Sequence, residues 1–273
     1  MADTSYPAAS LDTSVPNDAR IYDYWLGGKD NFAADREAAE RSALAVPQLP
    51  WLFRENRRFL GRAVRFCANA GINQFLDVGS GLPTMENVHE VAEQVTTDAR
   101  VVYVDNDPVV VSHARALLAG PRTAAIQGDL TRPDKILRAP GVHRVIDFSR
   151  PVAVLLVAVL HLVPDEVGAV GGVAKLRDAM APGSYLVISH ALMAPGHVTG
   201  RRVLSETARE LVKTRKGMPQ AAARTREEIA AFFGDMTLVE PGLTDAWSWR
   251  PDSESVLPES DPLTMLAGVD RKD

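Results

Sequence analysis

The chain has 273 residues, of which 46% are hydrophobic and 24% charged, so it can bury a substantial core. Its 30 basic and 35 acidic residues give a net charge of −5, which argues against nucleic acid or an anionic membrane as a general binding partner. Cys67 is the single cysteine, so no intrachain disulfide can form, and we expect a reducing, cytoplasmic location.

The N-terminal part of the chain is expected to consist of a flexible lead-in and a helical block. Residues 1–16 are rich in Ser, Thr, Pro and Ala and lack the basic and apolar regions of a secretion signal. Residues 17–70 have a helical pattern, which Pro47 and Pro50 are expected to break. Within this block, residues 22–32 combine aromatic side chains, carboxylates and Gly-Gly. This stretch forms either a lid over a bound ligand or a helix whose aromatic side chains pack on the core.

The middle of the chain alternates between strands and helices. Short, mainly apolar segments predict five strands, at residues 75–78, 101–104, 124–127, 152–159 and 185–189, of which the fourth is apolar throughout. Helices are predicted between strands at residues 88–95, 110–118 and 173–180, and Asp107 and Pro108 are suited to begin the second of them. Two closing strands, at residues 237–239 and 265–269, complete a seven-stranded, doubly wound, mostly parallel α/β sheet of the Rossmann-like type. No apolar run reaches the roughly 20 residues that a membrane-spanning helix needs, so we expect no membrane partner.

Two basic stretches are predicted to be solvated helix surfaces. Arg54, Arg58, Arg62 and Arg65 lie along one face of a helix, away from an apolar stripe. Residues 198–216 carry much of the remaining basic charge, inside a predicted helical insertion at residues 196–234. The insertion is expected to cover a substrate cleft; the acidic chain and the lack of interleaved aromatic residues argue against nucleic acid as its partner. After it, Thr225 and Glu228 are placed as a capping box for a further helix.

A ligand site is predicted where three consecutive strands end. The first strand contains Asp77 and runs into the turn Gly79-Ser80-Gly81, whose glycines let a backbone approach a ligand closely. Asp105 ends the second strand and Asp129 follows the third. Carboxyl ends of parallel strands meet at one edge of the sheet, where ligands of such folds bind.

The charge of this site favours a cationic nucleotide over a pyrophosphate. Thr84 stands where a dinucleotide-binding turn has its third glycine, which argues against a nicotinamide cofactor. Three carboxylates suit a ligand with a sulfonium and an amino group.

These motifs resemble those of class I S-adenosylmethionine-dependent methyltransferases. The match is closer still to an actinobacterial family of candidate methyltransferases, formerly a domain of unknown function. The resembling stretches are residues 19–32, 75–84, 101–108 and 157–161, and the resemblance runs from Pro16 to the end of the chain. It implies a single domain at residues 17–273, with a helical lid at 17–70, a cofactor-binding core at 71–195 and closing strands at 235–273.

The resemblance also implies how S-adenosylmethionine would be bound, with S-adenosylhomocysteine as the product. Gly79 and Gly81 would line the methionine part, Asp105 would hold the ribose and Asn106 would border the adenine. Gly128, Asp129 and Leu130 would contact the adenine edge, and backbone at Val157 and Ala158 would touch the methionine amino group. The expected cofactor site therefore consists of Asp77, Gly79, Ser80, Gly81, Asp105, Asn106, Gly128, Asp129, Leu130, Val157, Ala158 and Tyr22.

The sequence does not identify a catalytic group. His161 and His190 follow the fourth and fifth strands, and either is a general base or a histidine bonded to loop backbone. Tyr22 is a further candidate, and methyl transfer can also proceed by alignment of the reactants alone. No metal site is expected. The working hypothesis is methyl transfer to a small-molecule acceptor; the alternative is a non-catalytic protein that senses S-adenosylmethionine or S-adenosylhomocysteine.

Overall fold

The computed structural model describes residues 12–118, 120–193, 222, 224–252 and 263–273. The predicted basic helix at residues 198–216 lies outside the described residues, as does most of the insertion that contains it. Most of the flexible lead-in at residues 1–16 also lies outside them.

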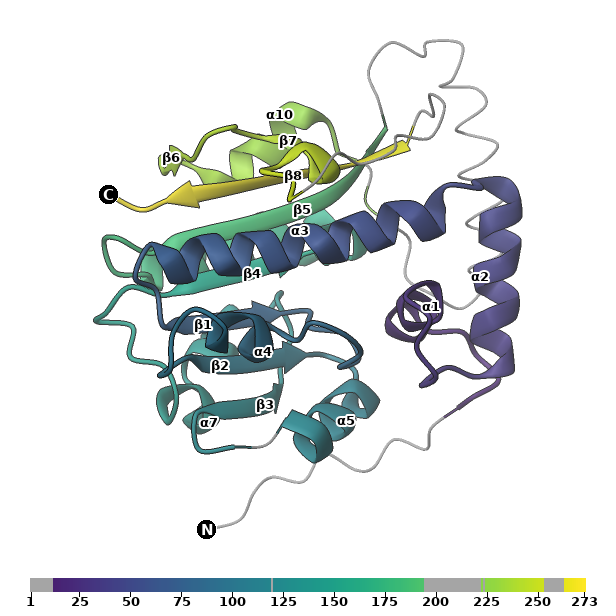
Figure 1. Cartoon of the computed structure of the whole chain (residues 1–273), viewed down its shortest axis with the longest axis horizontal. Helices are drawn as coiled ribbons and strands as arrows, with labels where there is room; N and C mark the ends of the chain where they lie inside the picture. The colour runs from purple at the N-terminus through teal and green to yellow at the C-terminus, as the bar shows by residue number, and fades with distance from the viewer. Residues whose placement is uncertain (1–11, 119, 194–221, 223, 253–262) are drawn as a thin grey trace.

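A single eight-stranded sheet forms the centre of the molecule, in the order β3-β2-β1-β4-β5-β8-β6, with β7 also paired to β8 (Figure 1). The strands are β1 (Gln74–Val78), β2 (Arg100–Asp105), β3 (Thr123–Gln127), β4 (Ala153–Val157), β5 (Tyr185–Met193), β6 (Thr237–Leu238), β7 (Thr244–Asp245) and β8 (Leu263–Arg271). The first five are parallel, and β8 is antiparallel to β5. The predicted doubly wound fold is confirmed. The sheet has one strand more than the seven predicted, and the additional strand is the short β7.

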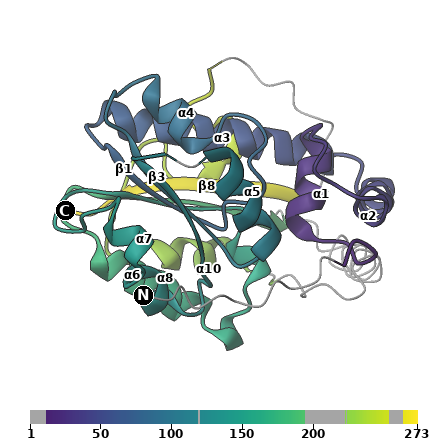
Figure 2. The ribbon, with the colours of Figure 1, turned by 90° about the horizontal axis from the view of Figure 1, so that it is seen from below.

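Helices cover both faces of the sheet (Figure 2). One face carries α3 (Leu49–Asn69), α4 (Val88–Glu93) and α5 (Pro108–Leu118). The other carries α6 (Pro133–Leu137), α7 (Pro140–His143), α8 (Ala169–Ala179) and α10 (Arg226–Ala230). Four short 3-10 helices lie at η1 (Leu160–Leu162), η2 (Asp165–Val167), η3 (Ala231–Phe233) and η4 (Ala246–Ser248). Neighbouring strand residues such as Phe75 and Leu76 point into opposite halves of the core, as the period of two requires.

Two N-terminal helices, α1 (Asp18–Trp25) and α2 (Ala33–Ala45), lie beside the carboxyl ends of the parallel strands (Figure 1). A buried ion pair of 2.8 Å between Arg20 and Asp35 joins them. Pro47 separates α2 from α3, as predicted, but Pro50 lies in the first turn of α3. The expectation that Pro50 breaks a helix is wrong, because an N–H in the first turn has no helical partner to lose.

Arg62 corrects the prediction that four arginines of α3 are solvated. Its side chain is 6% exposed, and it donates hydrogen bonds to the carbonyls of Trp249 (2.8 Å) and Ala246 (2.6 Å). The guanidinium therefore ties α3 to the segment before β8. A helical repeat of arginines could not reveal this, since both acceptors are more than 180 residues away in sequence.

Replacing Asp270 by asparagine is expected to stabilise the protein at pH 8. Asp270 is 2% exposed in β8, and its Oδ1 atom has no hydrogen-bond partner among the described residues. Burial raises its pKa to about 7, whereas an unfolded aspartate ionises near 4. Between these values only the unfolded chain loses the proton, so stability falls as the pH rises and the full penalty is present above pH 7.

The asparagine side chain carries no charge at either pH, so urea unfolding should give Asp270→Asn an advantage of about 2 to 4 kcal/mol at pH 8 and little advantage at pH 4. Asp178→Asn, on the exposed surface of α8, is the matched control and should change little at either pH. Equal stability of Asp270→Asn and the unsubstituted protein at pH 8 would contradict this prediction.

Candidate functional site

The turn after β1 is built around two glycines with left-handed backbone. Gly79 has φ +80° and Gly81 has φ +65°, which only glycine adopts without strain. The amides of Gly79 (2.8 Å) and Ser80 (3.2 Å) both donate to the carbonyl of Val104, which fixes the turn against the end of β2. A Cβ on Gly79 would lie 2.4 Å from Cγ2 of Val159, so the turn also fits closely against the chain that follows β4.

Helix α4 follows this turn and begins at Val88, where the helical spacing predicts it. Asn87 and Val88, at its N-terminus, line a pocket beneath the turn. A capping box occupies part of this N-terminus, in which the amide of Asn87 donates to the Glu90 carboxylate at 2.8 Å. The glycine turn therefore does not run directly into a helix N-terminus of the kind that binds pyrophosphate in dinucleotide-binding folds.

Asp105 joins the ends of the first two strands. One carboxylate oxygen accepts a hydrogen bond from the amide of Gly81 and the other from the amide of Asp107, both at 2.9 Å. Burial raises the pKa of Asp105, while these amide donors act against the shift. Asp105 thus lies beside the glycine turn, as the alignment of parallel strand ends predicts.

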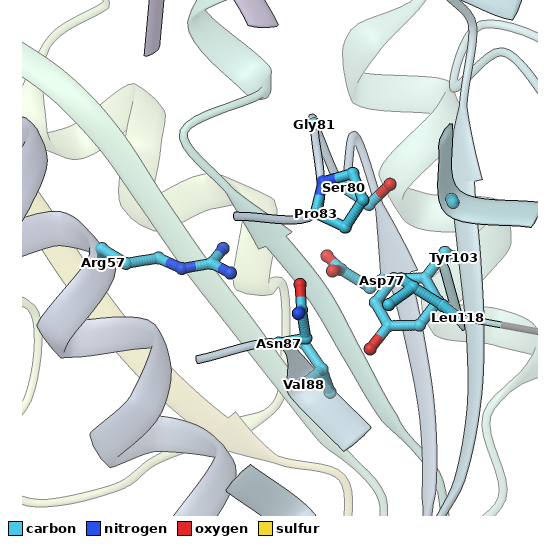
Figure 3. Close-up of a pocket in the computed structure, with 10 residues that line it drawn as sticks. Arg57, Asp77, Ser80, Gly81, Pro83, Asn87, Val88, Tyr103 and Leu118 are labelled. Carbon is cyan, nitrogen blue, oxygen red and sulfur yellow. The ribbon is translucent and has the colours of Figure 1, made fainter. Parts of the chain in front are cut away.

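A small pocket lies beneath this turn, and Asp77 is its buried acid (Figure 3). It is lined by Arg57, Asp77, Ser80, Gly81, Pro83, Asn87, Val88, Tyr103, Ala114 and Leu118. Burial is the main reason that the pKa of Asp77 is raised to about 7. The Arg57 guanidinium lowers the pKa of Asp77 and the Asp105 carboxylate raises it, so both charges act on this carboxyl group.

Arg57 is a site residue that the sequence prediction missed. Figure 3 shows its guanidinium pointing from α3 toward Asp77. The carbonyl of Met85 accepts hydrogen bonds from its Nε (2.8 Å) and from one terminal nitrogen (2.5 Å), which holds the cation beside the pocket. The available signal was position: Arg57 interrupts the apolar stripe of Phe53, Leu60 and Val64 at spacings of four, three and four residues.

The N-terminal segment is attached to the loop after β2. The amide group of Asn17, which caps α1, donates from Nδ2 to Oδ2 of Asp107 at 2.7 Å. The other oxygen of Asp107 accepts from the amide of Val109 at 2.7 Å and begins α5, as predicted. Asn106, between the two aspartates, is exposed. Helix α1 therefore lies next to the predicted ribose and adenine region.

The predicted adenine-edge residues follow β3 in a compact turn. The amide of Gly128 donates to the carbonyl of Asp105 at 2.9 Å, which places this turn beside the end of β2. Oδ1 of Asp129 accepts from the amide (2.9 Å) and hydroxyl (2.8 Å) of Thr131, and Leu130 is buried. Asp129 is thus near the same sheet edge as Asp105, with one carboxylate oxygen used inside its own turn.

Strand β4 ends at Val157, earlier than predicted, because Ala158 adopts a left-handed backbone with φ +57°. Such a conformation is strained for a residue with a Cβ. The amide of Ala158 donates to both the carbonyl (3.2 Å) and the hydroxyl (2.9 Å) of Ser189. Strained backbone held by neighbours at the edge of a sheet is typical of functional sites.

The two candidate histidines contact each other edge to face, with ring centroids 5.5 Å apart. His190 is fully buried; its Nδ1 donates to the carbonyl of Ala191 (2.7 Å) and its Nε2 accepts from Arg224 (3.0 Å). Burial and the Arg224 charge lower the pKa of His190 to about 4. These bonds favour the interpretation of His190 as a neutral histidine bonded to its surroundings. His161 is 8% exposed beside it.

Tyr22 is held by α3. Its hydroxyl donates to the carbonyl of Phe53 (3.2 Å) and accepts from Nδ2 of Asn56 (3.0 Å). Burial raises the pKa of Tyr22, and the charge of Asp77 adds to this shift, which places the phenol within electrostatic reach of the pocket.

Metal-binding clusters and membrane-spanning helices are both absent from the described part of the chain. There, no group of three or more His, Cys, Asp or Glu side chains is placed to hold a metal ion. No helix in the described ranges combines the length and the apolar character needed to cross a bilayer.

Comparisons with known proteins identify the family of the chain. A sequence profile described as S-adenosyl methyltransferase matches residues 4–273. The structure of a candidate methyltransferase from Thermobifida fusca YX is 46% identical, covers 98% of this chain and 98% of its own, and has a TM-score of 0.86. A DUF574 family protein from Streptomyces avermitilis MA-4680 is 40% identical, with 96% of this chain and 99% of that chain covered and a TM-score of 0.86.

A more distant likeness extends to the fold alone. The plantazolicin methyltransferase BamL, solved in complex with S-adenosylhomocysteine, is 12% identical, with 93% of this chain and 95% of that chain covered and a TM-score of 0.56. None of the curated proteins compared with the chain matches it.

Proposed function

Because this chain belongs to the S-adenosyl methyltransferase family and its cofactor is S-adenosylmethionine, we propose that it transfers the cofactor's methyl group to a small-molecule acceptor. The observation that supports this most strongly is the grouping of the glycine turn with Asp77, Asp105 and Arg57 at one edge of the sheet. The cofactor supplies an electrophilic methyl group on a sulfonium, and its amino-acid part carries an ammonium and a carboxylate.

The charged side chains of the pocket are complementary to that amino-acid part. Asp77 would attract the ammonium, and Arg57 would pair with the carboxylate, since a guanidinium is suited to this geometry. Gly79 and Gly81 would leave room for the methionine chain beside Ser80. We propose that Asp105 accepts hydrogen bonds from the ribose hydroxyls.

The remaining predicted residues would enclose the nucleoside. Asn106, Gly128, Asp129 and Leu130 surround the place proposed for adenine, and the backbone at Val157 and Ala158 would contact the methionine amino group. We further propose that α1 acts as a lid, because Asn17 attaches it to Asp107 next to this region.

No general base is assigned to the transfer. The residues of this chain would orient the acceptor's lone pair in line with the reactive methyl and exclude water, which is sufficient when the acceptor is already a good nucleophile. Both ring nitrogens of His190 are occupied, which argues against a role for it in proton transfer.

S-adenosylmethionine affinity is expected to fall as the pH drops below 7. Asp77 has a pKa of about 7 without ligand, so it is mostly protonated at pH 6 and must lose its proton to attract the ammonium. The dissociation constant should therefore rise by up to tenfold per pH unit below 7 and level off above it. Calorimetry between pH 5.5 and 7.5 measures this slope.

Asp77→Asn is the control for this titration. The asparagine variant should bind more weakly at pH 7.5 and show no slope, because the titrating group is gone. Parallel pH profiles for the two proteins would mean that another group, not Asp77, is linked to binding.

The acceptor class is tested with methyl-labelled S-adenosylmethionine. We would incubate the protein separately with fractionated small metabolites, transfer RNA and cell protein, and measure incorporated label. Label in the small-molecule fraction is the expected result. Label confined to RNA or protein would overturn the acceptor class, and saturated cofactor binding without any incorporation would instead indicate a sensor.

A further inference from the structure

A buried chain of polar groups connects α1 with the end of β4. Asn56 and Ser189 are fully buried, on α3 and β5 respectively. The Ser189 hydroxyl donates to Oδ1 of Asn56 at 2.6 Å, and Nδ2 of Asn56 donates to the Tyr22 hydroxyl at 3.0 Å. Because the Tyr22 hydroxyl donates to Phe53, it can only accept from Asn56, and this fixes the orientation of the Asn56 amide.

The other end of this series of hydrogen bonds is Ala158, the strained residue after β4. The Ser189 hydroxyl accepts the amide hydrogen of Ala158 at 2.9 Å while it donates to Asn56. A left-handed alanine is unfavourable by roughly 1 kcal/mol, so its surroundings must hold it there. Without Asn56, the Ser189 side chain can change rotamer and take its hydroxyl to another acceptor, which leaves only the longer bond to the Ser189 carbonyl to hold the Ala158 amide.

The conformation of Ala158 matters because it directs the next residue onto the glycine turn. Val159 occupies the space beside Gly79, where a Cβ would come within 2.4 Å of the Val159 side chain. The gap between the end of β4 and the turn after β1 is therefore set by the backbone at Ala158. On the proposed function, this gap receives the methionine part of the cofactor.

We propose that Asn56 is a positioning residue for cofactor binding, which acts through Ser189 to hold Ala158 in its left-handed conformation beside Gly79. This inference rests on the proposed function, since it assigns Asn56 to the same site. Asn56 would also couple α1 to the site, because its Nδ2 atom donates to the Tyr22 hydroxyl.

The test first removes the Asn56 side chain and then relieves the backbone strain at Ala158. Asn56→Ala should raise the S-adenosylmethionine dissociation constant about tenfold in calorimetry. Glycine adopts φ +57° without strain. The double variant Asn56→Ala/Ala158→Gly should therefore recover affinity to within about threefold of the unsubstituted protein, while its resistance to urea stays below that of the unsubstituted protein, because the buried partners of Asn56 still lack their bonds. A purely structural role for Asn56 would not give this separation.

Gln74→Ala is the matched control. Gln74 is also a buried amide, 1% exposed, and it bonds to the loop at Asp147 and Pro151 at the opposite edge of the sheet. It should lose stability without a change in cofactor affinity. Ser189→Ala provides a second variant should Asn56→Ala fail to fold, and it should weaken binding to a similar degree.

Two outcomes would overturn the inference alone: unchanged affinity in both Asn56→Ala and Ser189→Ala, or a double variant as weak as Asn56→Ala. Absence of binding to the unsubstituted, folded protein would overturn the proposed function as well.

Discussion

Gly79→Ala is expected to reduce S-adenosylmethionine affinity by at least a hundredfold. The new Cβ would meet Val159 at 2.4 Å, and the residue would be forced to keep φ +80°. Either the turn or the end of β4 must move, and both border the proposed methionine site. The same strain and overpacking should lower the free energy of unfolding by about 2 to 4 kcal/mol. Calorimetry and urea unfolding measure the two effects separately.

Gly71→Ala separates backbone strain from damage to the site. Gly71 has φ +92° at the end of α3, but a Cβ there would meet nothing within 4 Å. Its replacement should lower stability by about 1 kcal/mol and leave binding intact. If Gly79→Ala binds the cofactor as well as Gly71→Ala does, the glycine turn does not lie against the ligand.

Asp105→Ala is expected to weaken S-adenosylmethionine binding at least tenfold, or about 1.4 kcal/mol. The substitution removes the proposed ribose acceptor and also releases the amides of Gly81 and Asp107, which the carboxylate now holds at 2.9 Å. The fold should tolerate the change, because burial of the charge already works against the carboxylate form, as its raised pKa indicates.

The control for Asp105 is an aspartate at the other end of the same strand. Asp98 precedes β2 and accepts hydrogen bonds from Thr96 and Asn73 on the exposed surface. Asp98→Ala should leave affinity unchanged. Equal affinities for the Asp105 and Asp98 variants would remove Asp105 from the cofactor site.

The sequence predicted the strands and helix caps around the site because these depend on local patterns. Short, mainly apolar segments placed the five parallel strands, and the polar residues at their carboxyl ends then had to meet at one edge of the sheet. The caps at Asp107 and Thr225 were predicted for the same reason: each bonds to an amide two or three residues ahead. The strand β7 was missed because Thr244 and Asp245 are both polar, so the segment has no apolar residue that would indicate a strand.

The missed residues are polar side chains that point inward to distant partners. Asn56 bonds to Ser189, 133 residues away, and Arg224 reaches His190 and the carbonyl of Leu160. In a single sequence these residues resemble solvated positions, since only the fold brings their partners near. The functional roles proposed for Asp77, Gly79 and Asp105 are predictions that the variants above test.

The most direct test of the central claim is calorimetric titration of the unsubstituted protein with S-adenosylmethionine and S-adenosylhomocysteine at pH 7.5. We expect one site per chain with micromolar affinity for both ligands, since they share the amino-acid and nucleoside parts that Asp77, Arg57 and Asp105 are proposed to hold. A folded protein that binds neither ligand would contradict the assignment of this sheet edge as the cofactor site.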